Sequence, residues 1–236
     1  MAEDRGAGRR AWLARLDAMR GRMWVPKPID RARFTAEAAS AQWDAGAWDY
    51  LDGIGELSRY GVLAAFVRRL GGPEATILDV GCGEGLLREH IEVFERYVGI
   101  DVAPAAVERA RRRWEDARTS FLEGDSSSVS GPFDIVIMNE VLQQVPDPER
   151  QLDRAGRLMG PRGWLLVSLH RHVDNRGIWR MISIRFSQVD LVQVRSAKAR
   201  HSWRVGCFTG QASSRWQAVG GRAGVRREGV PREARE

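Results

Sequence analysis

Residues 76–85 of the chain read TILDVGCGEG, and this stretch decides the fold. A short apolar run ending at Val80 is typical of a buried strand. Three glycines at alternate positions follow it, at Gly81, Gly83 and Gly85. Glycine lets the backbone turn tightly and lets a ligand approach where any Cβ atom would exclude it. Since a segment with helical spacing comes next, the loop opens a helix whose N-terminal N–H groups favour an anionic group. The stretch therefore predicts a ligand-binding strand–loop–helix unit.

Outward from this unit, short apolar runs alternate with segments of helical spacing. The predicted strands are 76–80, 97–100, 120–122, 133–138 and 164–169, and the predicted helices are 56–70, 86–94, 105–114 and 148–158. Strands separated by helices pair in parallel through right-handed crossovers. Two further strands, 189–194 and 203–208, are joined by a polar turn and predict an antiparallel hairpin at one edge of the sheet. The sequence therefore predicts an α/β fold with a mainly parallel seven-stranded sheet.

An acidic residue follows the second predicted strand. Asp101 lies about 20 residues beyond the glycine strand, where a carboxylate suits the two hydroxyls of an adenosine ribose and repels a 2′-phosphate. The loop has the spacing Gly-x-Gly-x-Gly, whereas a dinucleotide-binding loop has Gly-x-Gly-x-x-Gly. Asp79 also lies inside the first strand, where a pyrophosphate would meet negative charge. A nicotinamide-dependent dehydrogenase stays as a competing interpretation that this spacing disfavours.

Several segments together resemble the class I S-adenosylmethionine (SAM)-dependent methyltransferases. The four segments similar to the first four motifs of that family are ILDVGCGEG (77–85), VGID (98–101), LEGD (122–125) and FDIV (133–136). The segment LMGPRGWLLV (158–167) is similar to the one that leads into their fifth strand. The resemblance covers roughly residues 56–208. It implies a Rossmann-like methyltransferase fold with SAM as the cofactor.

The resemblance also implies a set of cofactor-binding residues. They are Tyr60, Asp79, Gly81, Cys82, Gly83, Gly85, Asp101, Val102, Asp125, Ser126 and Asn139. The glycine backbone and Asp79 would hold the methionine end of SAM, with Asn139 facing the sulfonium. Asp101 would bind the ribose, although a role as the cap of the next helix stays open. Asp125 and Ser126 would flank the adenine. Cys82 is interpreted as a small packed residue and not as a nucleophile.

Two residues at strand ends are candidates for the chemistry. Methyl transfer needs an aligned nucleophile and a site that excludes water, and an oxygen or nitrogen nucleophile often needs a base. Glu140 follows the fourth predicted strand and His170 follows the fifth, at the edge where open α/β sheets bind ligands. The ordinary pKa of histidine lies near neutrality, which favours His170 as the base. Alternatively, Glu140 caps the following helix and His170 is a surface residue. Four scattered histidines and two distant cysteines predict no metal site.

Composition narrows the class of protein further. The net charge of +6 arises from basic ends, residues 1–35 and 171–236, around an acidic middle, residues 36–170. This distribution argues against a nucleic-acid substrate, which usually meets a basic face beside the active site. The sequence shows no apolar run of membrane-spanning length, and because no apolar segment follows the Arg-rich first residues we expect no signal peptide. Two cysteines are too few for a disulfide framework. We expect a cytoplasmic protein without membrane association.

The chain divides into three expected parts. Residues 1–55 form a helical lid or substrate segment, residues 56–209 form the SAM-binding domain, and residues 210–236 form a disordered basic tail. Because the substrate-recognising segments are short, we expect a small-molecule substrate, as in bacterial natural-product or small-metabolite biosynthesis, methylated on oxygen, nitrogen or carbon. Two alternatives stay open: an RNA or protein methyltransferase that uses the basic termini, and a non-catalytic SAM-binding module. A homodimer is compatible with the sequence.

Overall fold

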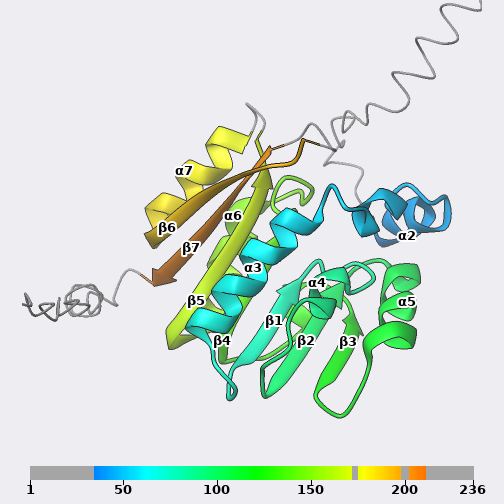
Figure 1. The fold of residues 1–236 in the computed structure, drawn as a ribbon, viewed down its shortest axis with the longest axis horizontal. Helices are drawn as coiled ribbons and strands as arrows, with labels where there is room; N and C mark the ends of the chain where they lie inside the picture. Colours follow the sequence, from blue (N-terminus) through cyan, green and yellow to red (C-terminus); the bar gives the residue numbers. More distant parts are fainter. Residues whose placement is uncertain (1–34, 172–174, 198–201, 211–236) are drawn as a thin grey trace, which may run out of the picture.

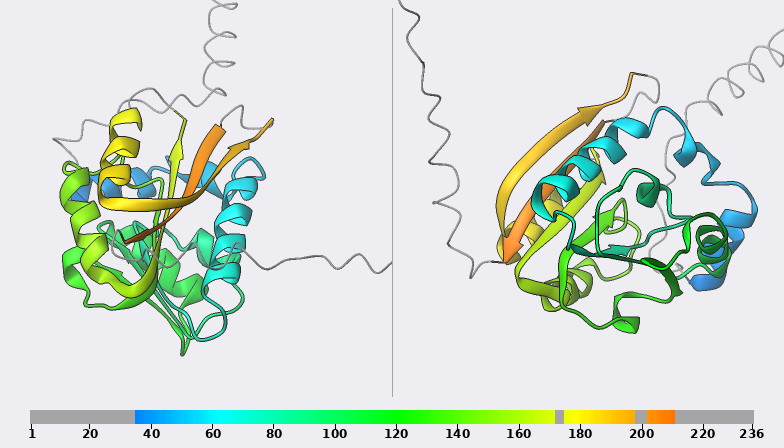
Figure 2. Two further views of the ribbon diagram at one scale, coloured as in Figure 1. Left: turned by 90° about the vertical axis from the view of Figure 1, so that its left-hand side faces the viewer. Right: turned by 60° about the horizontal axis from the view of Figure 1, so that its bottom comes forward.

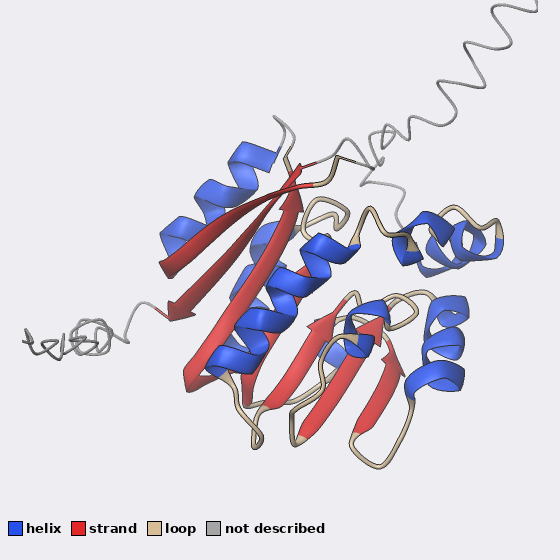
Figure 3. Ribbon diagram, in the orientation of Figure 1, coloured by secondary structure: helices blue, strands red, loops and turns tan. Residues whose placement is uncertain are grey.

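A seven-stranded sheet forms the centre of the molecule. The computed structural model describes residues 35–171, 175–197 and 202–210, and Figure 1 shows their arrangement. The strands are Thr76–Val80 (β1), Arg96–Asp101 (β2), Thr119–Glu123 (β3), Phe133–Asn139 (β4), Met159–His170 (β5), Phe186–Arg195 (β6) and Ser202–Gly210 (β7). Their order across the sheet is β3-β2-β1-β4-β5-β7-β6 (Figure 3). Strands β1 to β5 run parallel to one another, and β7 runs antiparallel to both β5 and β6. The predicted fold class, including the antiparallel edge pair, is confirmed.

Helices cover both faces of this sheet. The longer helices are α2 (Ala36–Asp44), α3 (Leu57–Leu70), α5 (Pro104–Trp114), α6 (Pro148–Leu158) and α7 (Asn175–Arg185), and the short ones are α4 (Leu86–Glu89), η2 (Asp49–Asp52) and η3 (Ser126–Ser128). Residues of α3, α4 and α5 share one apolar cluster with the sheet, and residues of α6 and α7 share the other. Figure 2 shows α3 and α7 on opposite sides of the strands. The sheet is therefore the middle layer of three.

Strand β4 shows why a continuous apolar run is needed at the centre. Successive side chains of a strand point to opposite faces. Ile135 and Ile137 belong to the cluster under α3, whereas Val136 and Met138 belong to the cluster under α6. All four side chains are fully buried. A polar residue at any of these four positions would be removed from water, whichever face it points to. The strand therefore does not show the alternation of apolar and polar residues that is typical of a strand with one exposed face.

Proline and short polar side chains set the starts of the outer helices. Asp147 accepts a hydrogen bond from the Arg150 backbone N–H at 2.9 Å, and Pro148 occupies the first helical position of α6. Proline fits there because that N–H would be unpaired in any case. Pro104 starts α5 in the same way, and the Thr35 side chain caps α2. These signals place the helices, and the helices in turn place the loops at the carboxyl ends of the strands.

Some predicted boundaries are wrong. The helix expected at 86–94 ends at Glu89, and the carbonyl of Ile91 accepts a hydrogen bond from the Arg88 side chain at 3.1 Å. The strand expected at 164–169 already begins at Met159, because the chain pairs with β4 on both sides of a shift in register. Both hairpin strands are longer than expected. Residues 1–34 and the tail 211–236 lie outside the described residues.

One side chain joins the amino ends of β1 and β4. Asp134 Oδ2 accepts hydrogen bonds from the backbone N–H and the hydroxyl of Thr76, each at 2.8 Å. We expect Asp134→Ala to lower the free energy of unfolding by about 1 kcal/mol, since two partly solvated hydrogen bonds are lost. Urea unfolding measures this change. Asp134→Asn keeps an acceptor oxygen and serves as the control. An equal loss in both variants would contradict this account of Asp134.

Candidate functional site

The loop after β1 has the tight geometry that its glycines indicate. Gly81, Gly83 and Gly85 have φ angles of +68°, +54° and +78°, in the left-handed region that other residues rarely adopt. A Cβ atom at Gly81 would collide with Val141, and one at Gly83 would stand 2.8 Å from the ring of Trp43. The loop therefore needs glycine both for its turns and for the side chains that pack on it.

Asp101 lies beside this loop at the end of β2. Its Oδ2 accepts a hydrogen bond from the Gly83 N–H, and its Oδ1 accepts one from the Ala103 N–H, each at 2.9 Å. Burial raises the pKa of Asp101, and the surrounding backbone N–H groups of Ala103, Gly83 and Val102 oppose that rise. Asp101 is not the cap of the next helix, because the N-cap of α5 is Ala103 and no side chain caps that helix; the bond from the Ala103 N–H instead fixes the turn before the helix. Each carboxylate oxygen has a further lone pair, so this role is compatible with binding a hydroxyl donor.

Asp79 is a buried carboxylate with one oxygen left over. The residue is 1% exposed, and the hydroxyl of Tyr97 on β2 donates a hydrogen bond to its Oδ2 at 2.5 Å. Its Oδ1 is buried and has no hydrogen-bond partner among the described residues. Burial raises the pKa of Asp79 to about 7; the Tyr97 hydrogen bond and the charge of Arg59 act against the rise, and the charge of Asp101 adds to it. Because an unpaired buried acceptor is costly, Oδ1 is suited to a donor from outside the protein.

Arg59 on α3 brings a buried positive charge to the same region. Its side chain is 1% exposed; Nη2 donates to Glu56 Oε2 at 2.8 Å, and Nη1 donates to Asn139 Oδ1. The guanidinium lies over the ring of Tyr60, 4.5 Å from its centroid. Burial acts to lower the pKa of Arg59, but Tyr60, Glu140 and Glu56 raise it overall, so the group stays charged. Its Nε is buried without a hydrogen-bond partner in the described part of the chain.

The turn after β4 is tied to β5. Asn139 Oδ1 also accepts from the Ser168 hydroxyl at 2.7 Å. Glu140 has a φ angle of +62°, which is uncommon for a residue other than glycine. Its carboxylate accepts from the Ser168 hydroxyl at 3.1 Å, the Gln143 amide at 2.9 Å and the His170 backbone N–H at 3.1 Å. Burial raises the pKa of Glu140. The Glu140 side chain therefore holds the turn that carries Asn139.

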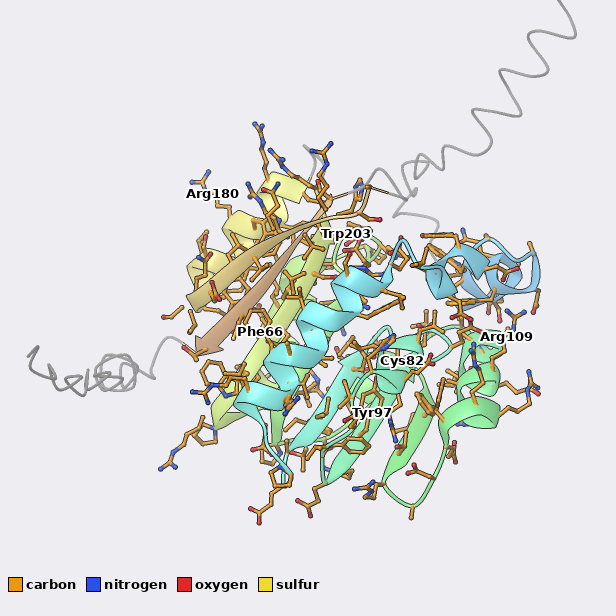
Figure 4. The ribbon with its side chains drawn as sticks, viewed as in Figure 1. Phe66, Cys82, Tyr97, Arg109, Arg180 and Trp203 are labelled. Carbon is orange, nitrogen blue, oxygen red and sulfur yellow. The ribbon has the colours of Figure 1, made fainter. Side chains whose placement is uncertain are left out.

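His170 closes the same edge of the sheet. It is the last residue of β5 and is partly buried, with its ring edge-on to Trp203 at a centroid distance of 6.3 Å. Its carbonyl accepts a hydrogen bond from the Asn175 side chain at 2.7 Å, at the start of α7. Figure 4 shows Trp203 at this upper end of the sheet. The structure thus brings His170 to the edge that carries Asn139 and Glu140.

The N-terminal helix α2 lies over the far side of the loop. The ring of Trp43 packs on Gly83 and on the first turn of α5, and it is 7% exposed. The Ser40 hydroxyl accepts a hydrogen bond from the Ala105 N–H at 3.0 Å, and Arg109 donates to the Trp43 carbonyl at 3.0 Å. Figure 4 shows Arg109 on α5 next to α2. Helix α2 therefore covers the region between the loop and α5.

The remaining expected residues differ in how they are placed. Asp125 is exposed, and its hydrogen bonds from the side chain and the backbone of Ser127 lower its pKa. Ser126 is buried, and its hydroxyl donates to Gln151 at 2.8 Å, so the structure directs that hydroxyl to α6. Cys82 is buried in the core under α3, and burial raises the pKa of its thiol. This agrees with the interpretation of Cys82 as a packed residue.

The described residues contain neither a metal-binding cluster nor a membrane-spanning helix. Among residues 35–171, 175–197 and 202–210, no group of three or more histidine, cysteine, aspartate or glutamate side chains is arranged to hold a metal ion. Within those same ranges, every helix is too short or too polar to cross a membrane.

Arg59 and Glu56 were not expected from the sequence, although one signal was present. Leu57, an apolar residue of α3, is 44% exposed, whereas Arg59 is buried on the inner face of this helix. Arg59 precedes Leu63 by four positions, which places it on the apolar stripe of the helix. A charge on such a stripe indicates a buried partner. Tyr97 was expected only as an apolar strand residue, because its hydroxyl leaves no trace in a hydropathy pattern.

Known proteins with similar sequences show the family of the chain. Residues 56–218 match a family described as a methyltransferase domain. The ubiquinone biosynthesis O-methyltransferase of Xanthomonas oryzae pv. oryzae is 37% identical over 101 residues, which are 40% of this chain and 42% of that protein. An uncharacterized methyltransferase of Mycobacterium tuberculosis is 33% identical over 112 residues, 45% of this chain and 57% of that protein. The matched regions thus span about half or less of these relatives.

Two solved structures show the same fold. The N-methyltransferase NodS of Bradyrhizobium japonicum, in complex with S-adenosylhomocysteine (SAH), gives a TM-score of 0.60 at 22% identity and covers 70% of this chain and 91% of its own. The 1,6-didemethyltoxoflavin-N1-methyltransferase of Burkholderia thailandensis, with SAH bound, gives 0.63 at 21% identity and covers 79% of this chain and 92% of its own. With the family match over residues 56–218, the chain belongs to the methyltransferase-domain family of class I SAM-dependent proteins.

Proposed function

We propose that the chain is an enzyme that transfers the methyl group of SAM to a small molecule. One observation carries the proposal: Asp79 Oδ1 and Arg59 Nε are both buried and both lack a hydrogen-bond partner within the described residues. Asp79 Oδ1 is an acceptor on a carboxyl group, and Arg59 Nε is a donor on a cation. The two residues lie close enough for the charge of Arg59 to lower the pKa of Asp79. An amino-acid group offers an ammonium to the first and a carboxylate to the second. The methionine end of SAM is such a group.

The rest of the loop fits the rest of the cofactor. The positive φ angles of Gly81, Gly83 and Gly85 turn the loop backbone tightly at the end of β1, which supports a role of this backbone in holding the methionine end of SAM. Asp101 keeps lone pairs for the ribose hydroxyls. The exposed carboxylate of Asp125 would flank the adenine, together with the backbone of Ser126, the partly buried Val102 and the buried Cys82 of the neighbouring loops. SAM, when bound, supplies a methyl group activated by a sulfonium.

The chain's own residues would then align the acceptor and remove its proton. Asn139, held by Arg59 and Ser168, would face the reacting end of the cofactor. The oxygens of Glu140 already accept hydrogen bonds, which favours a positioning role for Glu140 over a role as the base. We propose His170 as the base. The ring of Tyr60, buried beside Arg59, would help to exclude water.

A small acceptor is supported by the covering segment and by the similar proteins. Helix α2 and the 3₁₀ turn at Asp49–Asp52 are short elements that already pack on the core. Similar proteins are named for methylation of an oxygen in ubiquinone biosynthesis and of N1 in 1,6-didemethyltoxoflavin. We therefore propose an oxygen or nitrogen nucleophile on a small metabolite, with the part up to residue 55 acting as the lid.

Loss of the Asp101 charge should weaken cofactor binding. We expect Asp101→Asn to raise the dissociation constant of SAH about tenfold, which corresponds to about 1.4 kcal/mol. The amide keeps an acceptor for one of the two backbone N–H groups of Gly83 and Ala103, and it binds ribose hydroxyls less strongly than a carboxylate does. Isothermal titration calorimetry measures the change. Asp134→Asn, at the opposite edge of the sheet, should bind like the wild type. Wild-type protein that gives no heat with SAH would remove the proposed function.

Loss of the His170 imidazole should slow the chemistry and spare binding. We expect His170→Ala to lower kcat at least a hundredfold, the range typical of a lost general base. SAH affinity should stay within twofold of the wild type. SAH formation is measured with an acceptor that gives turnover with the wild type, chosen from a panel of small phenols, amines and N-heterocycles. An unchanged kcat would exclude His170 as the base. Cofactor binding without turnover on any acceptor would favour the non-catalytic SAM-binding alternative.

The buried carboxyl of Asp79 should cost stability as the pH rises. Its pKa in the folded chain, about 7, lies above the value of about 3.9 in an unfolded chain. The folded state therefore holds the proton more tightly, and stability conferred by this group is lost as the pH rises between those two values. We expect Asp79→Asn to gain in melting temperature relative to the wild type as the pH increases from 5 to 8, and to bind SAH poorly. Calorimetric melting at each pH tests this, and a pH-independent difference would contradict it.

A further inference from the structure

Tyr97 is a polar group enclosed by the apolar layer under α3. It lies on β2, is fully buried, and has the rings of Phe94 and Phe121 at centroid distances of 6.1 Å on either side. Figure 4 shows it in the body of the sheet, below Cys82. A buried phenol needs a hydrogen-bond partner, and the partner that the structure gives it is Asp79 Oδ2, at 2.5 Å.

The strand register explains why the two groups meet. Asp79 on β1 is paired with Gly99 on β2, and Tyr97 stands two positions earlier on the same face of β2. The phenol therefore reaches along the sheet toward the carboxylate from its core side. The contact uses Oδ2 and leaves Oδ1 as the buried oxygen without a partner in the described residues.

We propose that Tyr97 is a positioning residue for cofactor binding: its hydroxyl fixes one oxygen of Asp79 and thereby presents the other to a cationic ligand group. The inference rests on the proposed function, because that group is the ammonium of SAM. The hydrogen bond does two things at once. It sets the rotation of the carboxyl group, and it favours the charged form, which a cationic ligand requires.

The groups around Asp79 determine how strongly its pKa is raised, and the Tyr97 hydrogen bond acts against that rise. Asp101, at the end of β2, disfavours the carboxylate form, as does burial itself, whereas Arg59 on α3 favours it. Two further titratable groups face Asp79, the phenol of Tyr60 from α3 and the thiol of Cys82 from the loop, and both are neutral near pH 7 because burial raises their pKa values. Removing the Tyr97 hydroxyl therefore leaves a carboxyl that holds its proton to higher pH.

The variant Tyr97→Phe tests this, since it deletes one oxygen and keeps the ring. The first readout needs no ligand: the carboxyl carbon of Asp79 is titrated by NMR in the free protein. We expect its midpoint to rise by about one pH unit, the equivalent of one hydrogen bond. The second readout is SAH binding by calorimetry between pH 6 and 9. We expect about tenfold weaker binding than the wild type at pH 7 and a recovery of affinity toward pH 9.

Two control variants separate positioning from packing. Thr119→Val removes a buried hydroxyl from the residue paired with Tyr97 on β3, and that hydroxyl bonds Arg88 instead of Asp79. It should leave the Asp79 midpoint and its pH profile unchanged. Asp79→Asn should bind SAH weakly without any pH dependence in this range.

An unchanged Asp79 midpoint in Tyr97→Phe would overturn the inference, as would a loss of SAH affinity that persists at pH 9. Failure of the proposed function looks different. In that case the wild type itself gives no heat with SAH at any pH, while the NMR midpoint still reports whether Tyr97 controls the Asp79 carboxyl.

Discussion

Two opposite charges that are buried close together without pairing are the constraint on which the upper edge of the sheet depends. Asp79 comes from β1 and Arg59 from α3, and each is 1% exposed. A buried charge is costly unless hydrogen bonds satisfy it. Tyr97, Glu56 and Asn139 satisfy most of both groups and leave one atom on each unsatisfied. The fold thus keeps an unsatisfied acceptor and an unsatisfied donor in an otherwise apolar layer, and these two atoms are the basis of the proposed binding of a zwitterionic ligand group.

Much of the fold could be predicted because its signals are local. An apolar run followed by Gly-x-Gly-x-Gly is a backbone requirement, and the φ angles of Gly81, Gly83 and Gly85 meet it. The position of Asp101 beside the glycine loop could be predicted, because the residue follows a predicted strand and lies about 20 residues beyond the glycine strand. Asn139 and His170 reach the same edge for the same reason, since parallel strands all end there. The element ends were harder, because Arg88 and a register shift beside Gly160 act through tertiary contacts.

The rest of the site depends on contacts between residues far apart in sequence. Arg59 meets Asn139 across 80 positions, and an arginine on a helix is usually a solvated residue. Trp43 reaches Gly83 only because α2 folds back over α5 through Ser40 and Arg109. A hydroxyl within a strand, as in Tyr97, is invisible to patterns of hydrophobicity. The roles of such residues can be recognised only in the folded structure, where residues far apart in the sequence lie next to each other.

The left-handed backbone at Glu140 has a consequence for how the molecule assembles. That conformation costs on the order of 1–3 kcal/mol for a residue with a side chain. The groups that offset the cost include the carbonyl of Ser168, which accepts from the Glu140 N–H, and two donors on β5, the Ser168 hydroxyl and the His170 N–H. A nascent chain that ends before Met159 has none of these three contacts. The turn that presents Asn139 therefore matures only once the fifth strand has been synthesised and docked, which makes the binding edge a late product of folding.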